Sequence, residues 1–310
     1  MKKTLVAIAV MGVATSAAAI ELYNQDGVSV ELGGNIEVYY SNSFDDSEFK
    51  QELGDADFSF DTRYAVNDEF SIGGFWEFDG TNDASLGDAY VGFYTNSYGS
   101  LVAGKAATVL DDMGIGSDYQ FGLTSTVDAI DFGGFQVLRY NLDTDMFYGG
   151  VGVMQNRGQE NIATGDADGM LIDGKIGVRF SGFDVVAFAG QEDIIDKDDK
   201  STIYALEGRY SFDAVNLELG YYSVTLDKSN DLGGDTFAIA ADYSIDAWSF
   251  AAGLSNVSPE DSNASSFNEG FINAGYSIAP FTTLYAEVGF NGDDAVNEST
   301  AFAFGITAEF

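Results

Sequence analysis

The chain alternates hydrophobic and polar residues over much of its length, and a period of two predicts β-strands. In the first such segment Val28, Val30 and Leu32 share one face, while Ser29 and Glu31 share the other. The same pattern recurs to the end of the chain and predicts about 16 strands. The predicted spans are 28–41, 55–66, 69–80, 86–97, 100–106, 133–143, 145–156, 169–181, 183–195, 200–212, 214–226, 234–246, 248–258, 267–279, 281–291 and 298–310.

The connections between these strands alternate between short and long. Short turns such as Asn67-Asp68 and Asp246-Ala247 alternate with longer stretches such as 107–132. Strands of about 11 to 13 residues suit a tilted membrane crossing, which needs roughly 9–11 residues. A soluble β-sandwich, the alternative, usually has shorter strands. The sequence therefore predicts an all-β, transmembrane, antiparallel up-and-down β-barrel with short periplasmic turns and long external loops.

The polar faces of the strands carry many carboxylates, and these predict a water-filled interior. A barrel of about 16 strands is wide enough to enclose an aqueous channel. Burying so many carboxylates in a dry core would cost too much free energy. We expect the following acidic side chains to point into a wet lumen: Glu37, Asp61, Glu77, Glu218, Asp242 and Glu287.

The first residues have the plan of a secretory signal peptide. A basic start and a short apolar run lead to small residues that end in Ala17-Ala18-Ala19. The apolar run is too short for a membrane helix, which needs about 20 residues. We expect residues 1–19 to be a cleaved signal peptide and residues 20–310 to form a single barrel domain.

The composition is strongly acidic, with 50 Asp and Glu against 13 Lys and Arg and a formal net charge of −37. Such a field attracts cations and repels phosphates, so we expect no nucleic-acid partner. Histidine and cysteine are absent. Without histidine the commonest general base is missing, and we expect no enzymatic activity, no cofactor and no metal site. We interpret acidic clusters such as Asp45-Asp46 as solvated charge, and leave open that divalent cations bridge them to anionic lipid.

The stretch 107–132 is the longest connection and differs from an ordinary external loop. It carries Asp111, Asp112 and Asp118, yet it also contains apolar residues such as Leu110. An external loop does not need this apolar content, whereas a segment folded against the inner wall does. Connections of this length are usually functional or disordered. We expect this stretch to narrow the pore; the alternative is a plain surface loop.

Four segments resemble the general porins of Gram-negative bacteria. IELYNQDGVSVELGGNIEVYYS resembles their first strand, DAYVGFYTNSYGSLVAGK their fourth and fifth, and FQVLRYNLD their sixth. The terminal FAFGITAEF ends in an aromatic residue, Phe310, which resembles their barrel-assembly signal. That family forms trimers of barrels with about 16 strands. The resemblance implies a homotrimer that engages the barrel-assembly machinery, outer-membrane lipid and lipopolysaccharide.

The resemblance also implies a constriction in which loop carboxylates face a wall that is basic in the family. The loop side falls on Asp111, Asp112, Asp118 and Gln120. The wall side falls on Asn35, Asp57, Arg63, Lys105 and Arg139. Lys105 and Arg139 keep the family's positive charge, while Asn35 and Asp57 lack it. A narrow aperture with this balance is expected to be net negative and to select cations.

These features together predict a porin in the outer membrane of a Gram-negative bacterium. It would allow passive diffusion of small hydrophilic solutes and ions, with a preference for cations. One alternative is a substrate-selective channel for an oligosaccharide or a cationic solute. In that case a single ligand would block the ion current. Another is a surface adhesin or receptor on a barrel scaffold, which would not conduct ions.

Overall fold

The computed structural model describes residues 19–81, 85–123, 125–127, 130–155, 169–194, 199–227, 233–261 and 263–310. Seventeen β-strands within these residues form one sheet. No helix in the same residues is long and apolar enough to cross a membrane. Apart from Ala19, the predicted signal peptide 1–19 lies outside the described residues.

The strands follow one another around the sheet in chain order. They are β1 (Ile20–Gln25), β2 (Val28–Ser41), β3 (Lys50–Ala65), β4 (Phe70–Asp79), β5 (Ser85–Thr95), β6 (Gly99–Ala107), β7 (Gly133–Asp143), β8 (Phe147–Gln155), β9 (Met170–Phe180), β10 (Phe183–Ile194), β11 (Asp199–Phe212), β12 (Val215–Leu226), β13 (Gly234–Ile245), β14 (Trp248–Pro259), β15 (Phe267–Ala279), β16 (Thr282–Asn291) and β17 (Thr300–Glu309).

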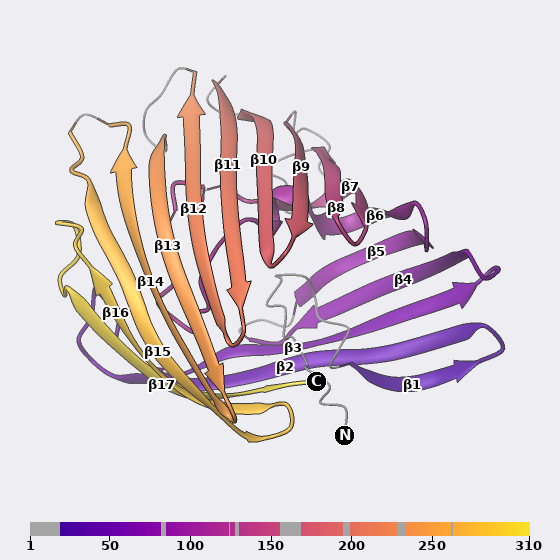
Figure 1. Ribbon diagram of the computed structural model, residues 1–310, viewed down its shortest axis with the longest axis horizontal. Helices are drawn as coiled ribbons and strands as arrows, with labels where there is room; N and C mark the ends of the chain where they lie inside the picture. The colour runs from indigo at the N-terminus through magenta and orange to yellow at the C-terminus, as the bar shows by residue number, and fades with distance from the viewer. Residues whose placement is uncertain are drawn as a thin grey trace.

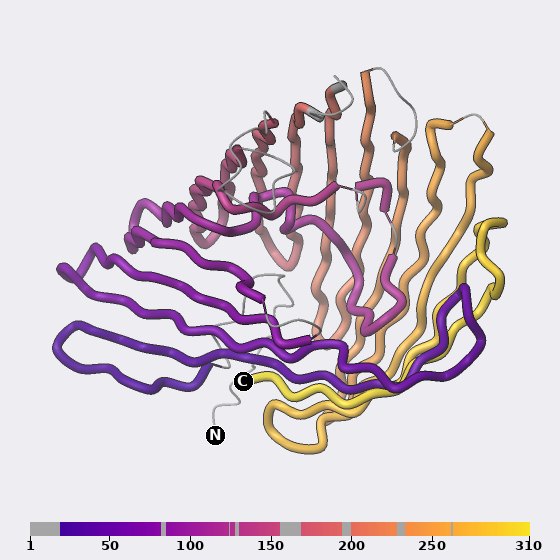
Figure 2. Tube along the Cα trace, turned by 180° about the vertical axis from the view of Figure 1, so that it is seen from behind, coloured from indigo at the N-terminus to yellow at the C-terminus, as the bar shows by residue number. Residues whose placement is uncertain are grey.

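Antiparallel pairing closes this sheet into a barrel. Each strand from β2 onward pairs with the next, and β17 pairs back with β2, so that sixteen strands form the ring and β1 is additional. In Figures 1 and 2 the strands β10–β15 and β2–β4 run at a steep angle to each other, as expected for two sides of a barrel with tilted strands. The predicted fold class is confirmed.

The strand prediction agrees with the structure at most ends to within one or two residues. The ranges 28–41, 133–143 and 267–279 coincide with β2, β7 and β15, while β3 begins at Lys50 rather than at 55. Short and long connections between the strands alternate, as predicted. The prediction misses β1, which turns into β2 through Asp26 and Gly27. Their φ angles of 54° and 78° are those of a two-residue hairpin turn.

The two ends of the chain meet along one edge of β2. β1 pairs with the first part of β2 and β17 with the rest. The backbone N–H of Phe310 donates to the carbonyl of Gly34 at 2.8 Å, and the N–H of Gly34 donates to the carbonyl of Phe310 at 2.6 Å. β1 therefore continues the line of β17 and covers the edge that β17 does not reach.

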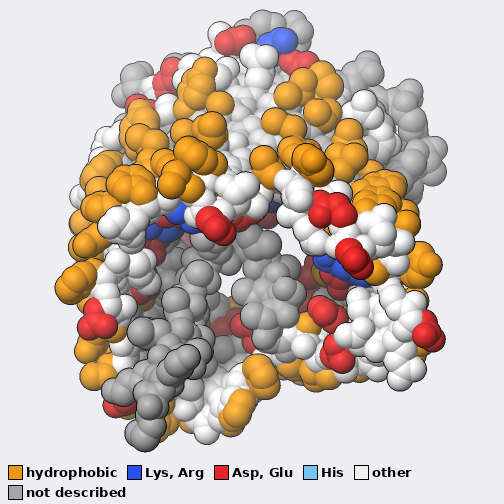
Figure 3. Space-filling model, turned by 45° about the vertical axis from the view of Figure 1, so that its right-hand side comes forward, with side chains coloured by type: hydrophobic (Ala, Val, Ile, Leu, Met, Phe, Trp, Pro, Cys, Tyr) orange, Lys and Arg blue, Asp and Glu red, His pale blue; other side chains and the backbone are white. Residues whose placement is uncertain are grey.

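Side chains alternate between the outer and inner faces of the wall. On β13 Phe237 and Ile239 are exposed on the outside, whereas Thr236 and Ala238, which alternate with them, are buried. Other strands repeat this alternation, and the outer surface becomes largely hydrophobic, as a surface that lies in a bilayer must be. Figure 3 shows these hydrophobic side chains around a hollow whose rim carries acidic and basic groups.

Candidate functional site

The connection between β6 and β7, residues 108–132, folds into the barrel and lies against its inner wall; we call it the constriction loop. It opens with a short 3-10 helix, η1 (Val109–Asp112). Its described residues then contact β11, β12, β15 and β16, reach β2, and return past β14 and β13. This course can be followed in Figure 2. The prediction that this stretch enters the pore is confirmed, and the surface-loop alternative is wrong.

The loop begins at an ion-paired anchor around Asp112. Oδ2 of Asp112 lies 2.5 Å from Nη2 of Arg139 on β7 and also accepts a hydrogen bond from the ammonium of Lys175 on β9. A second nitrogen of Arg139 donates to the carbonyl of Thr108 at 2.9 Å. The three charged side chains are only 11–14% exposed. Asp112 thus holds the loop to Arg139 and Lys175 on the wall and offsets part of their positive charge.

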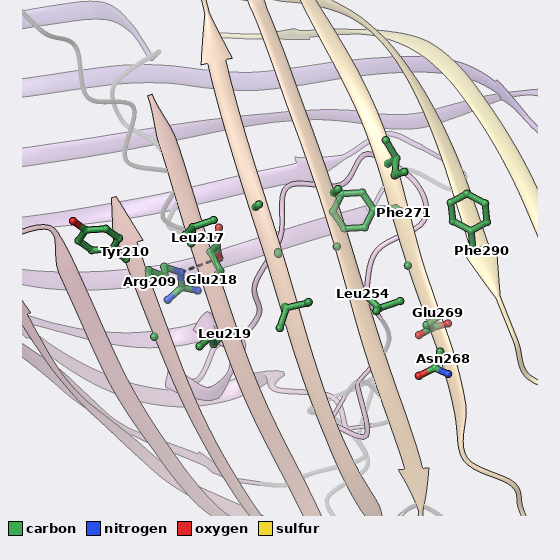
Figure 4. Close-up of a pocket in the computed structure, with 18 of the residues that line it drawn as sticks. Arg209, Tyr210, Leu217, Glu218, Leu219, Leu254, Asn268, Glu269, Phe271 and Phe290 are labelled. Atoms are coloured by element: carbon green, nitrogen blue, oxygen red, sulfur yellow. Dashed lines mark hydrogen bonds and ion pairs between the residues drawn. The ribbon is translucent and has the colours of Figure 1, made fainter. Parts of the chain in front are cut away.

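The middle of the loop is held by three charged side chains on β11 and β12. The N–H of Gly114 donates to Oε1 of Glu207 at 2.6 Å, and Arg209 donates to the carbonyl of Gly114 at 2.5 Å. The N–H of Gly116 donates to Glu218 at 3.4 Å. Arg209 also lies 2.9 Å from Glu207 and 3.2 Å from Glu218. Figure 4 shows Arg209 and Glu218 joined across neighbouring strands with the loop beyond them.

The tip of the loop is bound by one carboxylate, that of Glu287 on β16. Three successive backbone N–H groups donate to it, from Tyr119 at 2.7 Å, Gln120 at 2.8 Å and Phe121 at 2.6 Å. The side-chain amide of Asn273 on β15 adds a fourth bond at 2.9 Å. Successive amides that converge on one anion form a nest. Here the backbone of the loop supplies the nest and the wall supplies the anion.

These contacts correct the expectation that Glu218 and Glu287 face water. Both lie beneath the loop, where Glu218 is 8% exposed and Glu287 is 2% exposed. Burying a carboxylate is costly unless hydrogen-bond donors or a counter-ion replace its water. The loop amides replace that water for Glu287, and Arg209 with Gly116 does so for Glu218. These carboxylates therefore hold the loop rather than line the pore.

Asp111 and Asp118 are two carboxylates of the described part of the loop that remain exposed. Although their surfaces reach water, protein surrounds much of each group. This partial burial, followed by the charge of Asp112, raises the pKa of Asp111. Partial burial, followed by the charge of Glu287, raises the pKa of Asp118. Both groups bind protons at a higher pH than a freely exposed aspartate.

On the wall side, Asn35 and Arg63 are both engaged by neighbouring acids. Asn35 donates to Asp55 at 2.6 Å. Arg63 makes three hydrogen bonds of 2.7–3.1 Å with Asp61. Its guanidinium also lies 3.7 Å from the centre of the Tyr94 ring. The positive charge of Arg63 is therefore offset on its own strand.

The other predicted wall residues do not restore a basic cluster. Lys105 donates to the carbonyl of Leu86, and Asp57 lies opposite Asp79 in the register of β3 and β4. Gln120, predicted on the loop side, bridges the loop to Glu37 on β2 at 3.1 Å. A hollow of about 420 Å³ on this side has a mainly acidic lining. Its charged side chains are Glu31, Asp57, Asp61, Arg63, Glu77 and Glu309.

Sequence reasoning misses several residues that hold the loop. Glu207, Arg209, Lys175 and Asn273 were not among the predicted site residues, although the period of two places Glu207 and Arg209 on a polar strand face. What the sequence does not reveal is the segment that each one contacts. Within the described part of the chain, no group of three or more acidic side chains is arranged to hold a metal ion.

Comparison with known sequences agrees with this architecture. A family model described as "Gram-negative porin" matches residues 4–295. Porin-like protein H of Photobacterium profundum is 32% identical over 257 residues, which cover 77% of this chain and 78% of that protein. Both matches span most of the barrel and the constriction loop.

Solved structures show the same fold. OmpF of Salmonella typhi, in a complex with daunomycin, aligns with a TM-score of 0.79 at 17% identity and covers 94% of this chain and 100% of its own. OmpT of Vibrio cholerae in its trimer form aligns with a TM-score of 0.74 at 19% identity and covers 92% and 100%. At such low identities the likeness speaks for the fold alone.

Proposed function

This chain belongs to the family of Gram-negative porins, and from that premise we propose that it is a cation-selective channel for passive diffusion of small hydrophilic solutes. Its relatives are porins of the outer membrane, which are channels. The chain is accordingly an outer-membrane porin. The proposal concerns which ions and solutes pass.

The observation that carries the proposal is the acidic charge on the wall opposite the loop. The loop contacts run from β7 round to β16 and reach β2, so β3 to β6 form the other side of the aperture. On that side Asp57, Glu77 and Asp88 lie among the inward-facing residues, and Arg63 and Lys105 supply the basic charge. Because Arg63 is paired with Asp61, the balance on this wall is negative.

The charge acts on ions through a simple Coulomb term. At about 8 Å in a water-like dielectric, one carboxylate changes the energy of a monovalent ion by about 0.5 kcal/mol. The effect has opposite signs for cations and anions, so one carboxylate shifts their permeability ratio by about fivefold at most before salt screening. Several such groups at a narrow aperture support a clear cation preference.

The experiment is a planar-bilayer recording of the purified protein in a salt gradient. We expect the reversal potential to show a preference for cations and the double variant Asp57→Asn with Glu77→Gln to reduce it. The matched control is Asp46→Asn, which removes one exposed charge on the loop between β2 and β3. An anion preference in the unaltered protein would contradict the proposal, as would an equal loss of selectivity in the control.

We further propose a homotrimer in outer-membrane lipid and lipopolysaccharide, with a cleaved signal peptide at 1–19 and Phe310 as part of the assembly signal. The trimer form of Vibrio cholerae OmpT supports the oligomer. The two backbone hydrogen bonds between Phe310 and Gly34 support its role in closing the barrel. Cross-linking in mild detergent, N-terminal sequencing that begins at Ile20, and poor assembly after removal of Phe310 would agree with these proposals.

A further inference from the structure

Glycines on the inner wall lie directly beneath the side chains of the loop tip. A Cβ atom added to Gly275 on β15 would lie 2.4 Å from the hydroxyl oxygen of Tyr119. One added to Gly289 on β16 would lie 2.5 Å from Cγ of Phe121. Carbon atoms in ordinary contact are about 3.5–4.0 Å apart. The two loop rings therefore occupy the space that a side chain on the wall would fill.

The start of the loop is seated in the same way. A Cβ atom at Gly150 on β8 would lie 2.8 Å from Cγ1 of Val109, and one at Gly190 on β10 would lie 2.6 Å from Cδ1 of Leu110. Both loop side chains are fully buried. Glycines of the wall thus leave room for side chains of the loop both at its start and at its tip.

A large wall side chain lies opposite each of these two glycines in the strand register. Tyr285 lies opposite Gly275 across the strand pair, and its ring stacks on Tyr119 at 4.0 Å with an angle of 4° between the planes. Phe271 lies opposite Gly289 and is 1% exposed. Alternation of large and small residues on facing positions is how a packed interface interdigitates.

Not every glycine of the wall lies beneath the loop. At Gly208 on β11 an added Cβ atom would meet nothing within 4 Å. All three of the nearest contacts at Gly289 come from Phe121 of the loop. At Gly275 the nearest contact is Tyr119 of the loop, and Ser249 on β14 is also close, at 2.5 Å. These two glycines are therefore placed where the loop tip needs room.

We propose that Gly275 and Gly289 are positioning residues that, together with Glu287, seat the loop tip and set the cross-section of the pore. The proposal rests on the channel function given above. A methyl group at either position displaces the ring above it by about 1 Å to reach ordinary contact. Because Glu287 still holds the backbone of the tip, the ring moves into the lumen and narrows the aperture.

The experiment measures single-channel conductance and the swelling of liposomes in neutral sugars of increasing size. We expect Gly275→Ala and Gly289→Ala to lower the conductance and to slow large sugars more than small ones. Adding Tyr119→Phe and Ser249→Ala to Gly275→Ala removes the two oxygens that the methyl group meets, and should recover conductance. Gly208→Ala is the matched control and should behave as the unaltered protein. Heat-dependent migration on gels verifies that each barrel is folded.

A further variant gives a result even where the methyl variants fail to fold. Phe121→Ala empties the seat above Gly289 without any clash, and we expect a higher conductance and a larger size limit. Unchanged conductance in Phe121→Ala, or unchanged or raised conductance in folded Gly275→Ala or Gly289→Ala, would overturn the proposal. No recovery with Tyr119→Phe and Ser249→Ala together would overturn it as well. Neutral sugars keep this test separate from ion selectivity, and an unaltered protein that does not conduct would instead refute the channel function.

Discussion

Replacing Glu287 by glutamine is the most direct test of how the constriction loop is held. The substitution keeps the size of the side chain but removes its charge and one of its two acceptor oxygens. In the structure Oε1 accepts the N–H groups of Gln120 and Phe121, while Oε2 accepts those of Tyr119 and Asn273. Glutamine can keep the first pair of bonds, but it presents an NH2 group to the second pair of donors.

The expected cost follows from these four bonds. A hydrogen bond to a charged group contributes about 1.5–3 kcal/mol, and a neutral one about 1 kcal/mol. Losing two charged bonds and weakening two more would cost roughly 4–8 kcal/mol if the groups stayed dry. Because the released amides can bind water in the lumen, we expect a net cost nearer 3 kcal/mol. A change of that size lowers the population ratio of seated to released tip about 100-fold.

Two measurements follow the tip in this variant. Single-channel records should show added current noise and new conductance levels as the tip leaves its seat. The chain contains no cysteine, so a cysteine pair at Gln120 and Glu37 reports the distance between loop and β2 through its cross-linking yield, which should fall. Glu192→Gln is the matched control, because Glu192 is also buried, at 6% exposed, and accepts a bond from Ser201 on the neighbouring strand. Quiet, unaltered currents and full cross-linking in Glu287→Gln would refute the reasoning.

Two further predictions concern the loop charges. Asp112→Asn leaves Arg139 and Lys175 buried without their shared counter-charge. The free energy of unfolding should therefore fall by about 3 kcal/mol, and the reversal potential should shift toward that of an anion-preferring channel. Because partial burial raises the pKa values of Asp111 and Asp118, acidification neutralises these two before ordinary exposed carboxylates. As the pH is lowered, cation preference should therefore begin to fall at a pH above the usual pKa range of aspartate. Asp118→Asn should make the preference depend less on pH, and a variant with the same pH dependence as the unaltered protein would contradict this prediction.

The barrel could be predicted because its signal is local. Each strand shows its own alternation, and tight turns such as Asp246-Ala247 carry their own residue preferences. β1 escaped prediction because all six of its residues are exposed, so its sequence shows no buried face. It is defined instead by a two-residue turn and by the edge of β2. The predicted start of β3 was five residues too far along the chain, because its first residues, from Lys50, are also exposed.

The constriction was predictable in its location but not in its contacts. The apolar residues of 107–132 required an inner wall to cover them, and the resemblance paired Asp112 with a basic wall that includes Arg139. The bond between Tyr119 and Glu287, however, joins residues 168 positions apart. No local pattern distinguishes Glu287 from a carboxylate that lines water, nor Gly275 from a glycine such as Gly208. Those roles exist only once the loop is laid on the wall.

The acidic residues of the lumen therefore perform two separable tasks. Buried carboxylates such as Glu287 determine the shape of the aperture, because they accept hydrogen bonds from backbone amides of the loop and so hold it in place. Exposed carboxylates such as Asp111 and Asp118 leave their field free to act on ions. Neutralising a buried one should change which neutral sugars pass, whereas neutralising an exposed one should change the reversal potential alone. A single substitution at Asp111 that altered both readouts equally would mean that charge and shape are coupled rather than divided between these residues.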